Sequence, residues 1–137
     1  MATESKINFD LLTLVNMLLH SSYQFLFLSS ISRKLKMSGF AWATKLKESR
    51  CKDSALTILD WITEHGGTLM LAEVAEPKFS QSDLTAEFVV TRWDEVEKWL
   101  EEMIDNIHDK VLLSDLQDKL QTIQMLDLIK DNILSYS

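Results

Sequence analysis

Turn residues and cysteines are scarce in this sequence of 137 residues, which contains three Gly, one Pro and one Cys. An all-β chain needs a turn residue about every 8–12 positions, so these counts argue against that class. The single cysteine, Cys51, cannot form an internal disulfide, and its isolation excludes both a cysteine zinc site and a disulfide-rich secreted scaffold. We therefore expect one helical domain in a reducing compartment, the cytoplasm.

Basic residues are outnumbered, because 14 Lys and Arg face 21 Asp and Glu and give a net charge of −7. A general nucleic-acid binder is expected to be basic, so this balance argues against one. Residues 1–50 nevertheless carry seven basic and three acidic groups. We expect a solvated turn whose charges pair with acidic helices, and the alternative is a partner-binding patch. The basic excess lies mainly in Arg33, Lys34, Lys36, Lys45, Lys47 and Arg50.

Charged residues are missing from residues 11–32, a run long enough to span a bilayer. Nine Ser, Thr, Asn, Gln and His residues interrupt the run, and a membrane helix would have to satisfy each of them. A signal peptide is not indicated either, since Glu4 and Asp10 stand where basic residues are expected. The run predicts a helix that is buried on more than one side, by its own domain and by a second subunit.

Apolar residues recur at helical spacing in four segments, which predict helices over residues 8–36, 40–65, 82–109 and 114–135. Ser38-Gly39 is expected to break the first helix, and Gly66-Gly67 to cap the second. Capping-box patterns at Ser80 or Ser82 and at Ser114 predict where the last two helices begin. The third helix carries a heptad seam made of Val89, Trp93, Val96, Leu100, Met103 and Ile107. Four tryptophans lie at helical positions and are interpreted as packing residues: Trp42, Trp61, Trp93 and Trp99.

The connections between these segments predict the topology. Short links join the first helix to the second and the third to the fourth, so each pair is antiparallel. The link over residues 66–81 is long enough to cross the length of a helix. We predict an all-α fold with a single domain over residues 1–137, an antiparallel four-helix bundle with one long crossover connection between helices two and three.

Two segments carry a resemblance to the ferritin family. Residues 15–26 read VNMLLHSSYQFL, which resembles the ferritin pattern (I/V)-N-x-E-x-x-A-S-Y-x-Y-L. Residues 65–77 read HGGTLMLAEVAEP, which is similar to the stretch R-G-G-x-x-x-L-x-x-I-x-x-P that opens the crossover loop of ferritins. The two motifs occur in order and with matching spacing, and the third and fourth helices resemble the family less.

The resemblance implies a di-iron centre inside the bundle, with Glu on the first helix, Glu-x-x-His on the second, Glu on the third, and Glu or Gln on the fourth. Apolar side chains would fill that space here, and a metal-free cluster of buried carboxylates would be costly. We therefore predict no catalytic residue, no metal site and no cofactor. The family positions fall on Leu18, Cys51, Ser54, Val96, Ile123 and Leu126.

Other polar residues are weaker candidates for metal ligands. Asp105 and His108 are spaced by one helical turn, but the pattern places them toward solvent. His20 is expected to be a partly buried imidazole with its hydrogen bonds satisfied. Of the positions that bear mineral-nucleating carboxylates in some ferritins, only Asp53 is acidic.

The resemblance implies a ferritin-like protein without ferroxidase activity, not an enzyme, which acts as a catalytically silent or structural subunit linked to iron storage and iron homeostasis. We expect a homodimer or larger oligomer, mixed with active ferritin subunits, that binds neither nucleic acid nor membrane. Phe27, Leu28 and Ile31 are expected on its dimer face. We do not expect a 24-subunit shell, because large-cage ferritins line its channels with a fifth short helix, for which residues 1–137 show no pattern. The alternative is a helical-bundle protein–protein interaction module with no role in iron; a di-iron oxidase would require a register error of one turn on two helices.

Overall fold

The computed structural model describes residues 4–73 and 84–135, and within them it contains helices and no strand. This confirms the predicted all-α class with four helices. The middle of the crossover, including Ser80 and Ser82, lies outside the described residues. The helices are α1 (Glu4–Lys34), α2 (Ser38–Glu64), α3 (Ala86–Leu112) and α4 (Lys119–Leu134).

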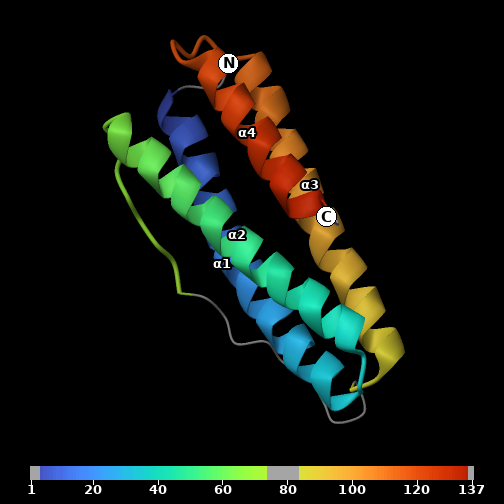
Figure 1. Ribbon diagram of the computed structural model, residues 1–137. Coiled ribbons are helices and arrows are strands. Elements are labelled where there is room, and N and C mark those ends of the chain that lie inside the picture. The colour runs from blue at the N-terminus through green and yellow to red at the C-terminus, as the bar shows by residue number, and fades with distance from the viewer. Residues whose placement is uncertain (1–3, 74–83, 136–137) are drawn as a thin grey trace.

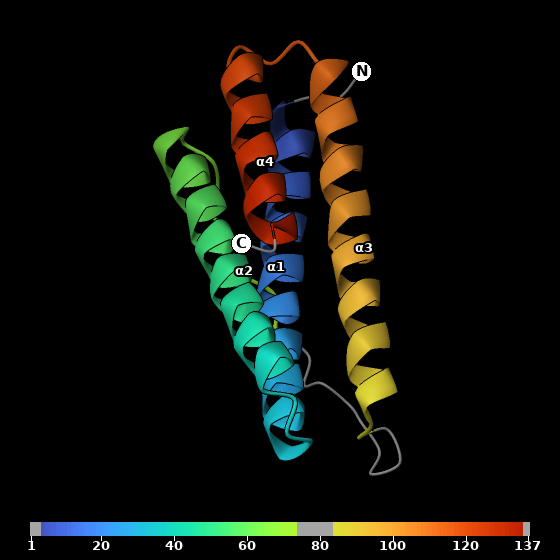
Figure 2. The ribbon, with the colours of Figure 1, turned by 45° about the vertical axis from the view of Figure 1, so that its right-hand side comes forward.

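The four helices form a bundle in which α1 runs antiparallel to α2, and α3 runs antiparallel to α4 (Figures 1 and 2). Helix α3 begins at the end of the bundle opposite to the end of α2, so the connection between them crosses the length of the bundle. Helix α1 contacts α2 and α3, and α4 contacts the same two helices. Helices α2 and α3 therefore face each other across the diagonal of the bundle.

Small polar residues of the uncharged run let α1 pack closely on α2. The hydroxyl groups of Ser22 and Ser29 donate to the backbone oxygens of Glu48 and Ala41, each at 3.0 Å. By length and composition α1 could cross a membrane, but half of its most apolar stretch is buried in the bundle. This burial is typical of the core helix of a bundle. Leu28 and Ile31 are also buried there, so their predicted place on the outer face is wrong.

Helices α1 and α2 end in the same backbone motif. At the end of α2, the N–H of Gly66 donates to Thr63 O and the N–H of Gly67 to Ile62 O, with Gly66 left-handed at φ 73°. The equivalent left-handed residue after α1 is Lys36, with φ 61°. The chain therefore turns at Lys36, and the prediction that Ser38-Gly39 breaks the helix is wrong because both residues begin α2.

The last two helices begin later than predicted. Helix α3 begins at Ala86, four residues after the predicted start, where the Thr85 hydroxyl accepts from the Phe88 N–H at 3.1 Å. Helix α4 begins at Lys119 and not at Ser114. The Ser114 hydroxyl donates to Val111 O at 2.7 Å, so this residue closes the end of α3 and does not cap α4.

The core follows the heptad seam of α3, whose members are buried or half-buried. Trp93 is buried within it and makes edge-to-face contacts with Phe25 and Phe40, with ring centroids 5.6 and 5.5 Å apart. Trp99 is exposed on α3 but packs edge-to-face on His20, with ring centroids 5.9 Å apart. The prediction of packing is wrong for Trp42 on α2, whose side chain is 65% exposed.

Replacement of Gly66 by Ala is expected to lower the free energy of unfolding by about 1 kcal/mol, because a Cβ is disfavoured at positive φ. The matched control is Gly39→Ala, where a Cβ meets no atom within 4 Å and helix propensity favours alanine. We expect that control to stabilise the protein by about 0.5 kcal/mol. Urea denaturation of both variants provides the measurement, and equal effects would contradict this account.

Candidate functional site

The residues on which the sequence resemblance places iron ligands lie in or against the core of this bundle. Leu18, Cys51, Val96 and Leu126 are buried members of one hydrophobic cluster, and each comes from a different helix. Ile123 is half-buried and packs against that cluster. Ser54 is also buried, and its hydroxyl accepts a hydrogen bond of 3.4 Å from the Asn132 amide.

A buried ion pair lies in the same interior, and sequence reasoning missed it. The Lys47 ammonium of α2 and the Glu97 carboxylate of α3 are 3.1 Å apart. Only 2% of Lys47 and 7% of Glu97 is exposed. Because α2 and α3 lie on opposite corners of the bundle, the pair bridges the centre of the four helices.

Both members of the pair make further interactions that satisfy their charges. Trp93 donates its indole N–H to Glu97, one turn further along α3. Lys47 donates to the backbone oxygen of Ile133, in the last turn of α4, and its ammonium lies 5.6 Å from the Trp93 ring centroid. The buried charges are therefore hydrogen-bonded as well as paired, which a low-dielectric interior requires.

The end of α4 explains why α2 places cations in the bundle. Helix α4 has 16 residues and ends partway along the bundle, beside the middle of α2 (Figure 2). The last carbonyl groups of a helix lack intrahelical donors and carry partial negative charge. Lys47 supplies a donor to one, and Arg50 donates to the oxygen of Ser135 at 2.7 Å.

The buried position of Lys47 overturns the prediction that it belongs to a solvated basic turn. Lys47 precedes Cys51 by four residues and therefore continues the apolar stripe of α2. A lysine within such a stripe was the signal that could have indicated a buried charge. Glu97 gave no comparable signal, because its neighbour Val96 occupies the heptad position and Glu97 therefore reads as a surface residue.

Cys51 is the remaining soft ligand in the interior, and its surroundings disfavour the thiolate. Burial raises the pKa of the Cys51 thiol to about 12, although the nearby Lys47 ammonium acts in the opposite direction. At neutral pH the group is therefore a protonated thiol. Metals and electrophiles react with the thiolate, so the side chain behaves as a small apolar group.

These residues do not fit a di-iron centre. Such a centre needs several carboxylates and an imidazole that converge on two cations. Among the described residues two carboxylates are buried: Glu97, which Lys47 and Trp93 already bind, and Asp10, which pairs with Lys110 at 3.2 Å. The Lys47 ammonium would also repel a divalent cation placed beside it. Within the described residues, no group of three or more His, Cys, Asp and Glu is arranged to hold a metal ion.

The weaker candidates take part in surface interactions. Asp105 is exposed and accepts from Lys130 at 2.7 Å, and this carboxylate raises the pKa of Lys130. His108 is half-buried, 3.5 Å from a carboxylate oxygen of Asp127. His20 is half-buried, 3.4 Å from the Gln24 amide, as predicted. Asp53 is exposed on α2.

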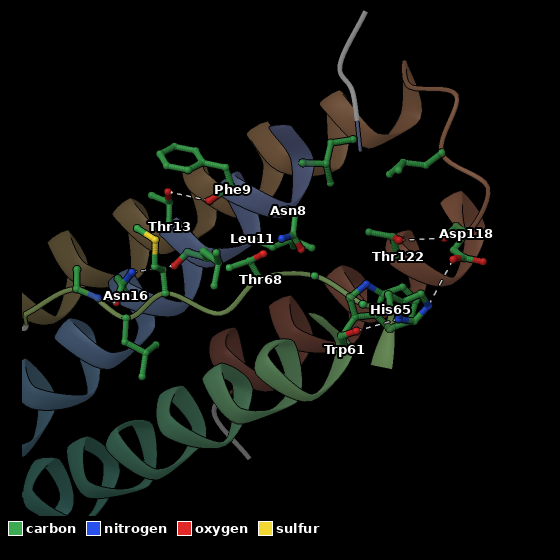
Figure 3. Close-up of a pocket in the computed structure, with 18 residues that line it drawn as sticks. Asn8, Phe9, Leu11, Thr13, Asn16, Trp61, His65, Thr68, Asp118 and Thr122 are labelled. Carbon is green, nitrogen blue, oxygen red and sulfur yellow. Dashed lines mark hydrogen bonds and ion pairs between the residues drawn. The ribbon is translucent and has the colours of Figure 1, made fainter. Parts of the chain in front are cut away.

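A cavity of about 810 Å³ lies between the first half of α1, the start of the crossover and the start of α4 (Figure 3). At one end the His65 imidazole stacks on Trp61 and lies 3.5 Å from Asp118. At the other end the Asn16 side-chain oxygen accepts from Ala72 N at 3.0 Å. These contacts hold the crossover against α1 and α4, and the walls that remain are mainly apolar.

Comparisons with known proteins address the fold. No family model matches the chain, and no curated protein matches it. A solved structure described as a humanized archaeal ferritin superposes with a TM-score of 0.74 over 98% of this chain and 82% of that chain. The fold is the ferritin-like four-helix bundle. The sequence identity is 15%, so this likeness concerns the fold alone.

Replacement of Lys47 by Met is expected to lower the free energy of unfolding by about 3 kcal/mol, because it leaves the Glu97 carboxylate buried without its cation. The double variant Lys47→Met/Glu97→Gln should recover at least about 1 kcal/mol, since the amide oxygen still accepts from Trp93 and no buried charge remains. Urea denaturation measures both. The control is Lys130→Met, which breaks a surface pair and should cost less than about 1 kcal/mol. Equal losses for the two single variants would contradict the role of the buried pair.

Proposed function

We propose that this chain is a ferritin-like protein without ferroxidase activity, and that it serves as a silent or structural subunit in iron storage and homeostasis. One observation carries the proposal. An ammonium group and apolar side chains occupy the interior where the family resemblance places iron ligands, and they come from all four helices.

The chemistry of the interior supports this function in three ways. Leu18, Val96 and Leu126 carry no donor atom. The Cys51 thiol is protonated at neutral pH. The Glu97 carboxylate is neutralised by Lys47, so iron would have to displace a buried ion pair before it could bind there.

The outer face of α1 supports an oligomer. Tyr23, Leu26 and Phe27 are exposed apolar residues on adjoining turns of α1, beyond Asn16, where the crossover contacts the helix. A wide apolar face of this kind is typical of a protein–protein interface. We propose that a second copy or an active ferritin subunit covers it, in the cytoplasm.

The same face also favours the second candidate, a helical-bundle module that binds an unrelated protein partner and has no role in iron. An apolar stripe on one helix can accept an amphipathic helix of a partner as readily as it accepts a second copy. The two candidates differ in native mass and in their response to Fe(II).

The purified protein is expected to oxidise Fe(II) no faster than buffer when two equivalents are added per chain in the presence of oxygen. Absorbance of Fe(III) provides the measurement. A rate well above buffer would refute the proposal. Glu97→Gln, with the exposed Glu102→Gln as its matched control, would then show whether the activity comes from the interior.

The native mass is expected to be that of a dimer or larger oligomer by light scattering after gel filtration. Leu26→Glu should produce a monomer, because a carboxylate in the apolar face is costly to bury. Leu128→Glu is the matched control, since Leu128 is exposed on α4. A wild-type monomer would contradict the oligomer and would favour the interaction module.

A further inference from the structure

A second cavity lies where α1 turns into α2, at the end of the bundle away from the first one. Its volume is about 470 Å³, within the range of about 300–1,000 Å³ that small-molecule sites occupy. Six residues line it: Arg33, Lys36, Ser38, Ala41, Trp42 and Lys45.

The charges in this cavity are unusual for the chain. Arg33, Lys36 and Lys45 are exposed, and within the described residues none of them forms an ion pair. The prediction that this turn pairs with acidic helices is therefore wrong for these three residues. Residues 51–137 carry seven basic and eighteen acidic groups, so the cavity is a local positive site on an acidic protein. An anion is the ligand that such a site attracts.

Lys36 adds evidence from the backbone. It occupies the left-handed position of a helix-ending motif, with φ 61°, where α2 uses Gly66 in the same motif. Glycine is the residue that this conformation favours, and a side chain with a Cβ is disfavoured there. A cation at such a strained position is grounds for inferring function.

Trp42 indicates that the anionic ligand also has an aromatic ring. Its indole is 65% exposed at the cavity, and in the described part of the chain no other ring and no cation stacks on it. An exposed indole beside three cations suits a ligand with an aromatic ring and a phosphate group. The first turn of α2, which begins at Ser38, has no side-chain cap and no acidic residue, so its N–H groups add to the attraction.

We propose that this cavity binds a free nucleotide, with the base on Trp42 and the phosphates on Arg33, Lys36 and Lys45. The cavity has room for a single nucleotide, and the net charge of −7 disfavours a long polyanion. The proposal is independent of iron and of the silent-subunit function.

Calorimetric titration with ADP, pyrophosphate, adenosine and a thymidine oligonucleotide tests the proposal. ADP is expected to bind more tightly than each of the other three probes. Trp42→Ala should weaken ADP about tenfold and leave pyrophosphate unchanged. The exposed Trp99→Ala on α3 is the matched control and should leave ADP binding as it is.

Lys36→Gly separates a binding role from a structural one. Glycine relieves the left-handed conformation, so the urea midpoint should rise, while ADP affinity should fall about fivefold through the lost charge. Lys52→Gln, at an exposed lysine of α2 outside the cavity, should leave ADP affinity unchanged.

Four results would overturn the proposal: no binding of ADP, pyrophosphate that binds as tightly as ADP, an oligonucleotide that binds more tightly than ADP, or unchanged ADP affinity in Lys36→Gly.

Discussion

The ion pair between Lys47 and Glu97 is the interaction on which the interior of this bundle depends. It joins two helices that lie on opposite corners, and it donates to the end of α4, which stops partway along the bundle. Without Lys47, a buried carboxylate and the last carbonyl groups of a helix would lose a donor. The Lys47 side chain thus links three of the four helices. Trp93, on the same helix as Glu97, donates a further hydrogen bond to that carboxylate.

Most of the fold was predictable because it rests on periodicity. The apolar spacing along residues 82–109 indicated the helix and its buried face, and the long link after Gly66-Gly67 indicated the crossover. The starts of α3 and α4 were predicted four and five residues early. For α4 the reason is that a serine such as Ser114 has the same side chain whether it caps a new helix or closes the previous one. The hydrogen bond from the Ser114 hydroxyl to Val111 O, within the last turn of α3, decides between these roles.

The interior was harder to predict than the fold. The family resemblance placed Leu18, Val96 and Leu126 in the core, where the structure has them. It could not reveal that Lys47 lies there too, since a lysine among six basic residues of one segment has the composition of a surface patch. The exposed Trp42 is the converse case, because an indole at helical spacing is normally buried. In both cases the residue type predicted one environment and the helix face determined another.

The basic residues of the segment from Arg33 to Arg50 therefore fall into two groups with different physical roles. Lys47 and Arg50 point toward α4 and use their charge to satisfy backbone oxygens, whereas Arg33, Lys36 and Lys45 form no ion pair with any described residue. Under the proposed function the buried ion pair and apolar side chains occupy the interior, so a role in iron storage would be exercised through the surfaces of the bundle. The apolar face of α1 and the basic cavity beside Trp42 are two such surfaces, and they differ in chemistry. One excludes water and suits a protein partner, and the other concentrates positive charge and suits a small anion.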